Sequence, residues 1–492
     1  MSIRHYSLAN SLRPRGPGAT RKVTTSIRSL AEKWLPTLFR DSTHRLDYRL
    51  RDAIAKHSPE EYVVNTKVLP VYRFVDLYRA INALGNSNAE SGGITIDRID
   101  TKTKEDLTDL LRADLTDWHS RKIVRSSKSA WTIADDVEEF LPTNCFWIFT
   151  CPHSVSAHPV IVRLNHNAYD EQANLEVAAC GSEAAKVLLT LVLEHSLTHS
   201  IYRHQLLSVS FQTGNKDEFG DIEKQERLRI GFRLASPVAR DQFVIDDQVF
   251  STLYRNVVDL YRRRAVLKQH GVPLRRGVLL YGPPGTGKTY ACRYLFGELP
   301  ETTRIVATGR TLHKISQVFD LARLYQPSLI VLEDVDLVFA SREINLYSSS
   351  LGDLLDQMDG LRPHEDVSVI LTTNAIERLE SAIKDRPGRI SQCIYLGPPG
   401  AALRQRYLTH YIKPYNSAAI DWEQLVTRSE GATPAFIKEW VHRAVQYATE
   451  RIDSDHLTLQ LTTKDFDSAH EEMTRYTDES GKRIIGFISQ LQ

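Results

Sequence analysis

Several residue classes are scarce in this chain of 492 residues, and each scarcity argues against a class of protein. Five cysteines occur at scattered positions, which argues against a disulfide framework and fits a reducing compartment. The 62 basic and 61 acidic residues nearly cancel to a net charge of +1, so the whole chain is not a polyelectrolyte built for nucleic acid or an anionic membrane. The longest apolar run, within Ala184–Leu193, is interrupted by Lys186 and is too short to span a bilayer.

Acidic residues are absent from the first 31 residues, which carry six basic residues and several serines. This pattern fits either a disordered basic tail of a cytoplasmic protein or a transit peptide that leads to the mitochondrial matrix. Pro14, Gly16, Pro17 and Gly18 would break an amphipathic helix and favour the tail. We therefore expect residues 1–40 to form a basic, disordered tail, and we find no apolar core of a secretory signal peptide.

The remaining composition is that of a globular protein with more than one domain. Residues 40–85 are expected to be mostly helical, and residues 182–196 have the spacing of an amphipathic helix. Strand-like runs occur at 146–164, 206–211 and 228–234. The sequence thus predicts an α+β N-terminal domain over 41–245, which would serve target recognition or assembly.

The second half of the chain alternates strand-like and helical segments after a helix at 249–267, which predicts an α/β fold with a parallel sheet covered on both faces. After Pro398 and Pro399 the pattern becomes helical. We therefore expect an α/β domain over 246–397, a helical lid over 398–478 and a C-terminal tail over 479–492. The strands are expected at 278–281, 304–307, 329–332, 367–372 and 393–396.

A glycine-rich segment follows the first of these strands and opens a helix. Its glycines allow a tight turn in which successive N–H groups point at phosphate oxygens, and the helix adds its positive N-terminal end. Lys288 would reach the β- and γ-phosphates, and the hydroxyl of Thr289 would coordinate Mg²⁺. The predicted ATP-binding residues are Gly282, Pro283, Pro284, Gly285, Thr286, Gly287, Lys288 and Thr289.

Polar residues follow two later strands. Glu333 and Asp334 come directly after four apolar residues, at the strand end where ligands bind in such sheets. One acid, assigned to Glu333, would hold Mg²⁺, and the other would polarise the attacking water. Asn374 ends the segment TTN and could orient that water, and Arg386 and Arg389 could bind phosphate.

Together and in this order, the segments GPPGTGKT, LEDVD, LLDQMDG, TTN and RPGR resemble the AAA ATPase family over about 246–475. The resemblance implies ATP hydrolysis with Mg²⁺, a chaperone-like remodelling activity and a homo-oligomeric ring, usually a hexamer. It also implies that Arg386 and Arg389 act on the nucleotide of the adjacent subunit. The segment SEGATPAFIKEWVHRA, residues 429–444, resembles the family's second-sensor helix.

The chain departs from the family pattern at three places. The acid pair is Glu333-Asp334 rather than Asp then Glu, an order that resembles the branch containing the mitochondrial translocase that assembles the Rieske protein into complex III. Asp334 is one methylene shorter than the usual glutamate, so turnover is expected to be slow. Lys384 and Asp385 lengthen the stretch before Arg386 by one residue.

The third departure concerns the segment between Leu312 and Val318, where peptide-threading relatives carry an aromatic–glycine pore loop. Only His313, Lys314, Ile315, Ser316 and Gln317 intervene here. We therefore predict a ring ATPase that remodels or moves a folded partner and is not a threading unfoldase.

Two other functions remain open from the sequence. One is an ATP-gated scaffold with little hydrolysis, and the other is a nucleic-acid-dependent ATPase of a mobile-element or defence system. Nucleic acid is the less favoured partner because of the neutral total charge, and the protein target is not indicated. The spacing of Cys145, Cys151, His153 and His158 matches no zinc pattern, so no metal site is expected there.

Overall fold

The computed structural model describes residues 45–54, 59–86, 96–103, 105–112, 123–149, 156, 158–167, 171–213, 226–234, 236, 238–340, 344–377, 379, 390–451, 459–475, 481 and 486–487. The chain divides into two compact units. Unit 1 contains Met1–Trp131 and Phe140–Ser196, and unit 2 contains Thr132–Glu139 and Leu197–Gln492. The basic tail predicted for residues 1–40 lies outside the described residues. No helix in the described part of the chain is both long and apolar enough to cross a membrane.

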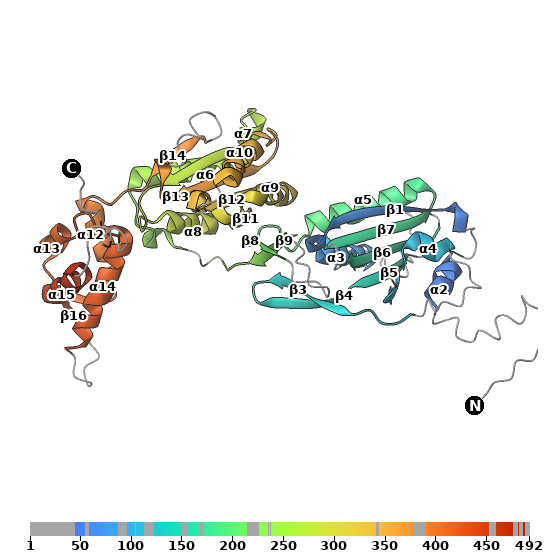
Figure 1. Cartoon of the computed structure of the whole chain (residues 1–492), viewed down its shortest axis with the longest axis horizontal. Helices are drawn as coiled ribbons and strands as arrows, with labels where there is room; N and C mark the ends of the chain where they lie inside the picture. Colours follow the sequence, from blue (N-terminus) through green and yellow to red (C-terminus); the bar gives the residue numbers. More distant parts are fainter. Residues whose placement is uncertain are drawn as a thin grey trace, which may run out of the picture. The chain divides into compact units, whose positions relative to one another are not determined.

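Unit 1 is built on an antiparallel sheet of five strands in the order β1-β7-β6-β5-β2 (Figure 1). The predicted helical character of residues 40–85 is wrong in part, because residues 62–70 form strand β1 and pair with β7. The strands are β1 (Tyr62–Pro70), β2 (Ile96–Asp100), β5 (Asn144–Phe149), β6 (Val160–Asn167) and β7 (Gln172–Cys180), and β3 (Lys128–Ala134) pairs separately with β4 (Val137–Pro142).

Helices pack on both faces of this sheet. Successive side chains of a strand point to opposite faces, so apolar residues on both faces need to be covered. Phe146 and Ile148 of β5 join a core with α2 (Leu46–Ala53) and α4 (Leu107–Arg112). Trp147 points to the other face, where its ring lies 5.6 Å from that of Tyr78 in α3. The remaining helices of unit 1 have the bounds Phe74–Asn86 for α3 and Ser182–Thr198 for α5, the latter close to the predicted 182–196.

Unit 2 contains a sheet of seven strands in the order β14-β10-β13-β12-β11-β8-β9, which confirms the predicted α/β class. All neighbours are parallel except β8 and β9. The bounds are β8 (Leu206–Thr213), β9 (Glu226–Phe232), β10 (Arg276–Tyr281), β11 (Thr303–Thr308), β12 (Ser328–Glu333), β13 (Val367–Thr373) and β14 (Gln392–Tyr395). Strands β8 and β9, which lie before the expected domain start at 246, therefore extend the sheet of the second half.

Both faces of this sheet are covered by helices (Figure 1). Val278 and Leu280 of β10 pack with α6 (Asp247–Arg262) and α8 (Lys288–Glu298), whereas α9 (Ile315–Leu324) packs against β11 and β12. The helix predicted at 249–267 is divided at Arg263 into α6 and α7 (Arg264–Gln269).

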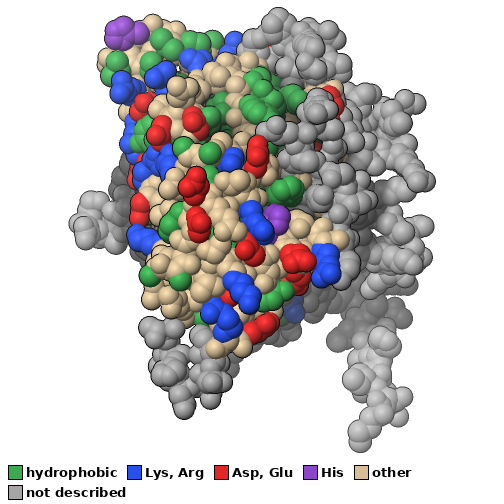
Figure 2. All heavy atoms as spheres, turned by 90° about the vertical axis from the view of Figure 1, so that its left-hand side faces the viewer, with side chains coloured by type: hydrophobic (Ala, Val, Ile, Leu, Met, Phe, Trp, Pro, Cys, Tyr) green, Lys and Arg blue, Asp and Glu red, His purple; other side chains and the backbone are tan. Residues whose placement is uncertain are grey.

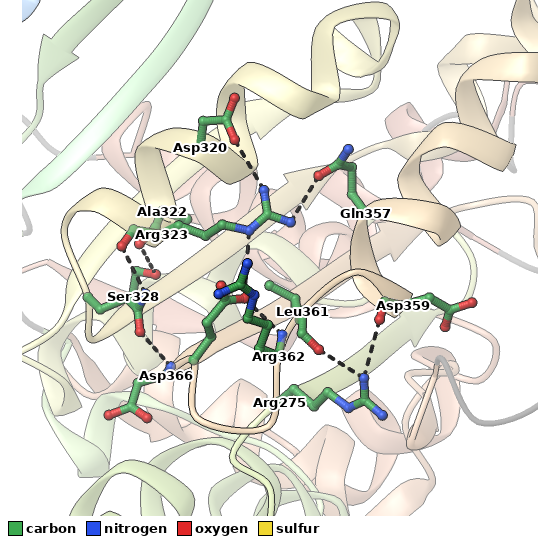
Figure 3. A network of polar contacts seen from close by, with 12 residues as sticks. Arg275, Asp320, Ala322, Arg323, Ser328, Gln357, Asp359, Leu361, Arg362 and Asp366 are labelled. Carbon is green, nitrogen blue, oxygen red and sulfur yellow. Dashed lines mark hydrogen bonds and ion pairs between the residues drawn. The ribbon is translucent and has the colours of Figure 1, made fainter.

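A polar network ties α9 to the end of α10 (Ile344–Asp359), and Arg323 lies at its centre (Figure 3). Its guanidinium donates to Asp320 at 3.2 Å and to Gln357 at 3.0 Å. Ser328 and Asp366, at the amino ends of β12 and β13, belong to the same network. The segment LLDQMDG thus has a structural role at the amino ends of the strands, whereas the glycine-rich loop lies at their carboxyl ends.

The lid is a helical subdomain with its own core, in which Trp440 and Phe436 are fully buried. Its elements are α12 (Ala401–Ile412), α13 (Trp422–Arg428), α14 (Pro434–Thr449) and α15 (Thr463–Arg475), with a two-stranded pair of β15 (Asn416–Ala419) and β16 (Gln460–Thr462). Apart from that short pair, the helical character predicted after residue 398 is observed.

Candidate functional site

The glycine-rich loop connects β10 to α8 in the predicted manner. Gly282, Gly285 and Gly287 have φ values of 145°, 79° and 99°, which L side chains rarely adopt. A Cβ atom on Gly282 would also collide with the carbonyl oxygen of Leu396. The loop therefore needs glycine at these positions to turn tightly against the end of β14.

Lys288 begins α8 and is 6% exposed. Its ammonium donates to the carbonyl oxygens of Gly282 at 2.8 Å and Pro283 at 2.9 Å. Burial lowers the pKa of Lys288, and the charges of Asp334 and Asp336 oppose that shift. The side chain is therefore held inside the curve of the loop, where it could bind an anionic ligand.

The two acids lie at the end of β12 with Thr289 beside them. Burial raises the pKa of Glu333, the charge of Asp334 raises it further, and a hydrogen bond from the Thr289 side chain opposes both effects. The structure thus brings together Thr289 and Glu333, the two predicted metal-binding residues. Their hydroxyl and carboxylate oxygens are of the kind that coordinate Mg²⁺.

Asp334 has the left-handed φ of 51°, and its backbone N–H donates to Oγ1 of Thr372 at 3.0 Å. Asn374, one residue beyond β13, donates from Nδ2 to Oδ1 of Asp334 at 3.2 Å. The predicted amide and the predicted water-polarising acid therefore share a hydrogen bond. Asp334 and Asn374 lie close together because β12 and β13 are parallel neighbours, so the carboxyl ends of the two strands lie side by side.

A cavity of about 610 Å³ joins these residues. Its size suits a small organic ligand. One wall contains Pro284 to Thr289 of the glycine-rich loop, with Asp334 and Asn374. In the other wall, Pro434, Ala435 and Lys438 belong to the segment 429–444 that resembles the second-sensor helix. The rest of that wall comes from residues that no sequence motif indicated: Gln242, Phe243, Val244, Ile245, Tyr290, Tyr407, His410 and Tyr411.

The lid contacts the loop directly. The backbone N–H of Ala435, in the first turn of α14, donates to the carbonyl oxygen of Gly285 at 3.1 Å. The side chain of Thr433 caps α14, and the hydroxyl of Tyr407 donates to the carbonyl oxygen of Val244 at 2.6 Å. A ligand in the cavity would therefore touch both the sheet and the lid.

The remaining predicted residues are placed as follows. Arg386 and Arg389 lie outside the described residues, as do Lys384, Asp385, Cys151 and His153. Cys145 is buried in unit 1, and the described residues contain no group of three or more His, Cys, Asp or Glu side chains that could hold a metal ion by themselves. Asp336, the last residue of LEDVD, was given no role from the sequence, although its position in that segment could have singled it out.

Part of this chain is similar to known proteins. Residues 278–398 match the family described as "ATPase family associated with various cellular activities (AAA)". The chain is 28% identical over 295 residues to ATPase family AAA domain-containing protein 2 of Homo sapiens, covering 52% of this chain and 21% of that protein. It is 28% identical over 253 residues to a 26S proteasome regulatory subunit 8 homolog of Encephalitozoon cuniculi, covering 48% of this chain and 62% of that protein. It is also 28% identical over 232 residues to the ATP-dependent zinc metalloprotease FtsH of Marinobacter nauticus, covering 44% of this chain and 36% of that protein. The chain therefore spans less than two thirds of each of these relatives.

Proposed function

We propose that this chain, which contains a domain of the AAA ATPase family at residues 278–398, hydrolyses ATP within a homo-oligomeric ring and remodels or moves a folded protein partner. The meeting of the glycine-rich loop, Asp334 and Asn374 in one cavity carries the hydrolysis part of the proposal. A ring, usually a hexamer, is what the resemblance to the family implies.

In this proposal, Lys288 and the loop N–H groups bind the phosphates of ATP. Thr289 and Glu333 hold Mg²⁺, which would neutralise charge on the phosphate oxygens. Asp334 accepts a proton from the attacking water, and the amide of Asn374 fixes the orientation of that acid. Arg386 and Arg389 complete the site of the adjacent subunit.

The segment that would carry a pore loop supports an activity other than peptide threading. Residues 309–314 form a short 3₁₀ helix, η6 (Gly309–Lys314), which runs directly into α9, and Thr311 and Leu312 are buried. The ring of His313 contacts Phe211 at 5.7 Å and the carboxylate of Glu226 in β9. An aromatic side chain that could grip an extended polypeptide is missing from this segment.

The branch of the family and the partner class are part of the same proposal. The Glu333-Asp334 order favours the branch that contains the Rieske-protein translocase, whose cargo would be a folded protein. Charges of both signs are interspersed on the face of the molecule shown in Figure 2, which gives that face no continuous basic surface for nucleic acid.

Steady-state ATPase assays test the proposal with wild type, Lys288→Ala, Asp334→Asn and Glu333→Gln. We expect slow but measurable turnover in wild type and a loss of at least tenfold in each variant, because each removes a charge from the site. Equal rates in wild type and Asp334→Asn would instead identify an ATP-gated scaffold. Stimulation by DNA or RNA that is lost at high salt would identify a nucleic-acid-dependent enzyme.

A second assay tests the choice of partner. A stable tagged protein that is threaded through the ring would lose its fold in an ATP-dependent manner, and we expect no such loss. Processive unfolding of that protein would overturn the non-threading part of the proposal. A pull-down with Asp334→Asn, which should retain ATP, then identifies the partner that the wild type releases.

A further inference from the structure

Asp336 connects the ends of the two strands that carry the acid pair and Asn374. The residue is 9% exposed and lies two positions after Asp334. Its Oδ1 atom accepts a hydrogen bond from the hydroxyl of Thr373 at 2.8 Å and another from the backbone N–H of Asn374 at 3.1 Å. One carboxylate oxygen thus holds the last residue of β13 and the residue that follows it.

A second bond runs between the same segments in the opposite direction. The N–H of Asp334 donates to Thr372, so the first threonine of TTN fixes the backbone of the acid. The second threonine and the backbone of Asn374 are fixed by Asp336. With both segments held, the side-chain amide of Asn374 reaches Oδ1 of Asp334 at 3.2 Å.

We propose that Asp336 is a positioning residue for ATP hydrolysis, which acts through Thr373 and Asn374 to place the Asn374 amide on Asp334. The inference rests on the proposed function, because it needs a hydrolytic site at Asp334. Without the Asp336 acceptor, the N–H of Asn374 and the hydroxyl of Thr373 lose their bonds in a largely buried place, and the segment would adjust to recover them. A shift of about 1 Å in the amide is enough to slow a reaction strongly.

Asp336 could also act through its charge, which raises the pKa of Lys288 against the effect of burial. An asparagine at this position distinguishes the positioning role from the charge role, because its neutral amide can replace the hydrogen-bond acceptor but not the negative charge. In Asp336→Asn the amide oxygen can accept both hydrogen bonds at the position of Oδ1, while the charge is lost. In Asp336→Ala the acceptor and the charge are both lost.

The experiment compares wild type, Asp336→Asn, Asp336→Ala and Thr373→Val in the full chain, with separate measurements of kcat and of the dissociation constant for ATP. Asp320→Ala is the matched control, because it removes a carboxylate that is 69% exposed at the opposite edge of the sheet. We expect Asp336→Ala to lower kcat by roughly 10- to 100-fold, the size that one or two lost hydrogen bonds allow. ATP affinity should change by less than about threefold, because the phosphate-binding loop is intact.

Rescue distinguishes positioning from charge. Asp336→Asn should keep kcat within about threefold of wild type, Thr373→Val should fall between the two Asp336 variants, and Asp320→Ala should match wild type. If Asp336→Asn is as slow as Asp336→Ala, or if Asp336→Ala is as fast as wild type, the inference is wrong. If Asp336→Ala does not fold, unchanged kcat in Thr373→Val overturns it. A wild type that binds ATP without turnover would instead overturn the proposed function itself.

Discussion

Single residues of this site are fixed by backbone geometry as much as by chemistry. Gly282 shows this most directly, because its φ of 145° and its close approach to Leu396 both exclude a side chain. The carbonyl of Leu396 lies one residue beyond β14 and shortly before the lid begins. The first glycine of the loop is therefore also the place where the loop and the connection to the lid touch.

The substitution Gly282→Ala should weaken ATP binding and destabilise the fold. The methyl group would strain the backbone and push the loop away from Leu396, so we expect a loss of about 2–4 kcal/mol in the free energy of unfolding and at least a tenfold loss of ATP affinity. Calorimetric titration with ATP and chemical denaturation measure the two effects.

The matched control is Gly352→Ala in α10, where an added Cβ meets no atom within 4 Å. This substitution should leave ATP affinity unchanged and raise the free energy of unfolding by up to about 1 kcal/mol, because alanine favours helix. If both variants behave alike, close packing of the glycine-rich loop does not limit nucleotide binding.

At the scale of elements, η6 lies between the catalytic edge of the sheet and its outermost strands. A Cβ on Gly309 would collide with the carbonyl oxygen of Asp334, so η6 begins in direct contact with the acid pair. Near its other end lies His313, whose side chain contacts Phe211 in β8 and Glu226 in β9. A movement of η6 would therefore displace both Asp334 and the strands β8 and β9.

A double-mutant cycle on His313→Ala and Glu226→Ala measures how firmly η6 is attached. Both side chains are 35% exposed, so we expect a coupling of about 0.5–1 kcal/mol in the free energy of unfolding, decreasing at high salt. Arg443→Ala with Glu439→Ala is the control for an exposed ion pair within one helix. A coupling indistinguishable from zero at low salt would show that the contact does not hold η6 in place.

The lid contains a histidine that makes its stability depend on pH. His470 of α15 lies among the rings of Phe436, Trp440 and Phe487, and burial lowers its pKa from 6.5, assisted by Arg428 and opposed by Asp467. The unfolded chain binds a proton near pH 6.5, whereas the folded lid resists it until a lower pH. The contribution of this residue is complete above pH 6.5 and is lost as the pH falls from there toward the folded pKa.

We therefore expect His470→Gln to reduce the loss of stability between pH 7 and pH 5. Chemical denaturation across that range measures the slope, and His364→Gln, in an exposed loop, serves as the control that keeps the wild-type slope. The variant would lose some aromatic packing at all pH values, so the slope and not the absolute stability is the decisive quantity. An unchanged slope would contradict the role given to His470.

The elements also show what the sequence could and could not predict. Strands β10 to β14 were predicted within a few residues because each is a short apolar run bounded by turn residues. Addition of β8 to the sheet was not, since Leu206 pairs with Arg304, almost a hundred positions later, and no local pattern encodes that pairing. The acid pair and Asn374 lie in short motifs that point to phosphate chemistry. Phe243, which precedes α6, and Tyr411 of the lid lie in no such motif, and they line the cavity only because of the tertiary fold.

At the scale of the whole molecule, nucleotide binding and assembly are linked by the proposal that each site needs two subunits. Lys288 and Asp334 lie in the cavity of their own chain. Arg386 and Arg389 are assigned to the neighbouring site, and the resemblance to the family is the basis of that assignment. Two different inactive variants should therefore be able to repair each other in a mixed ring.

Mixing Lys288→Ala subunits with Arg389→Ala subunits tests this directly. Each variant alone should hydrolyse ATP at less than about a tenth of the wild-type rate, because one lacks the phosphate-binding lysine and the other the arginine that completes a site. In a ring assembled at random from equal amounts, about a quarter of the sites combine an intact loop with an intact arginine from the next subunit. The mixture should therefore recover activity that neither variant has alone, in an ATPase assay after joint assembly. Lys288→Ala mixed with Asp334→Asn is the control, since both defects lie in the same cavity. Every subunit of that mixture keeps one defect in its own site, so mixing restores no site and no activity should return. If the first mixture stays inactive while both variants still form rings with wild type, then Arg389 acts within its own chain or not at all, and the two-subunit site is wrong.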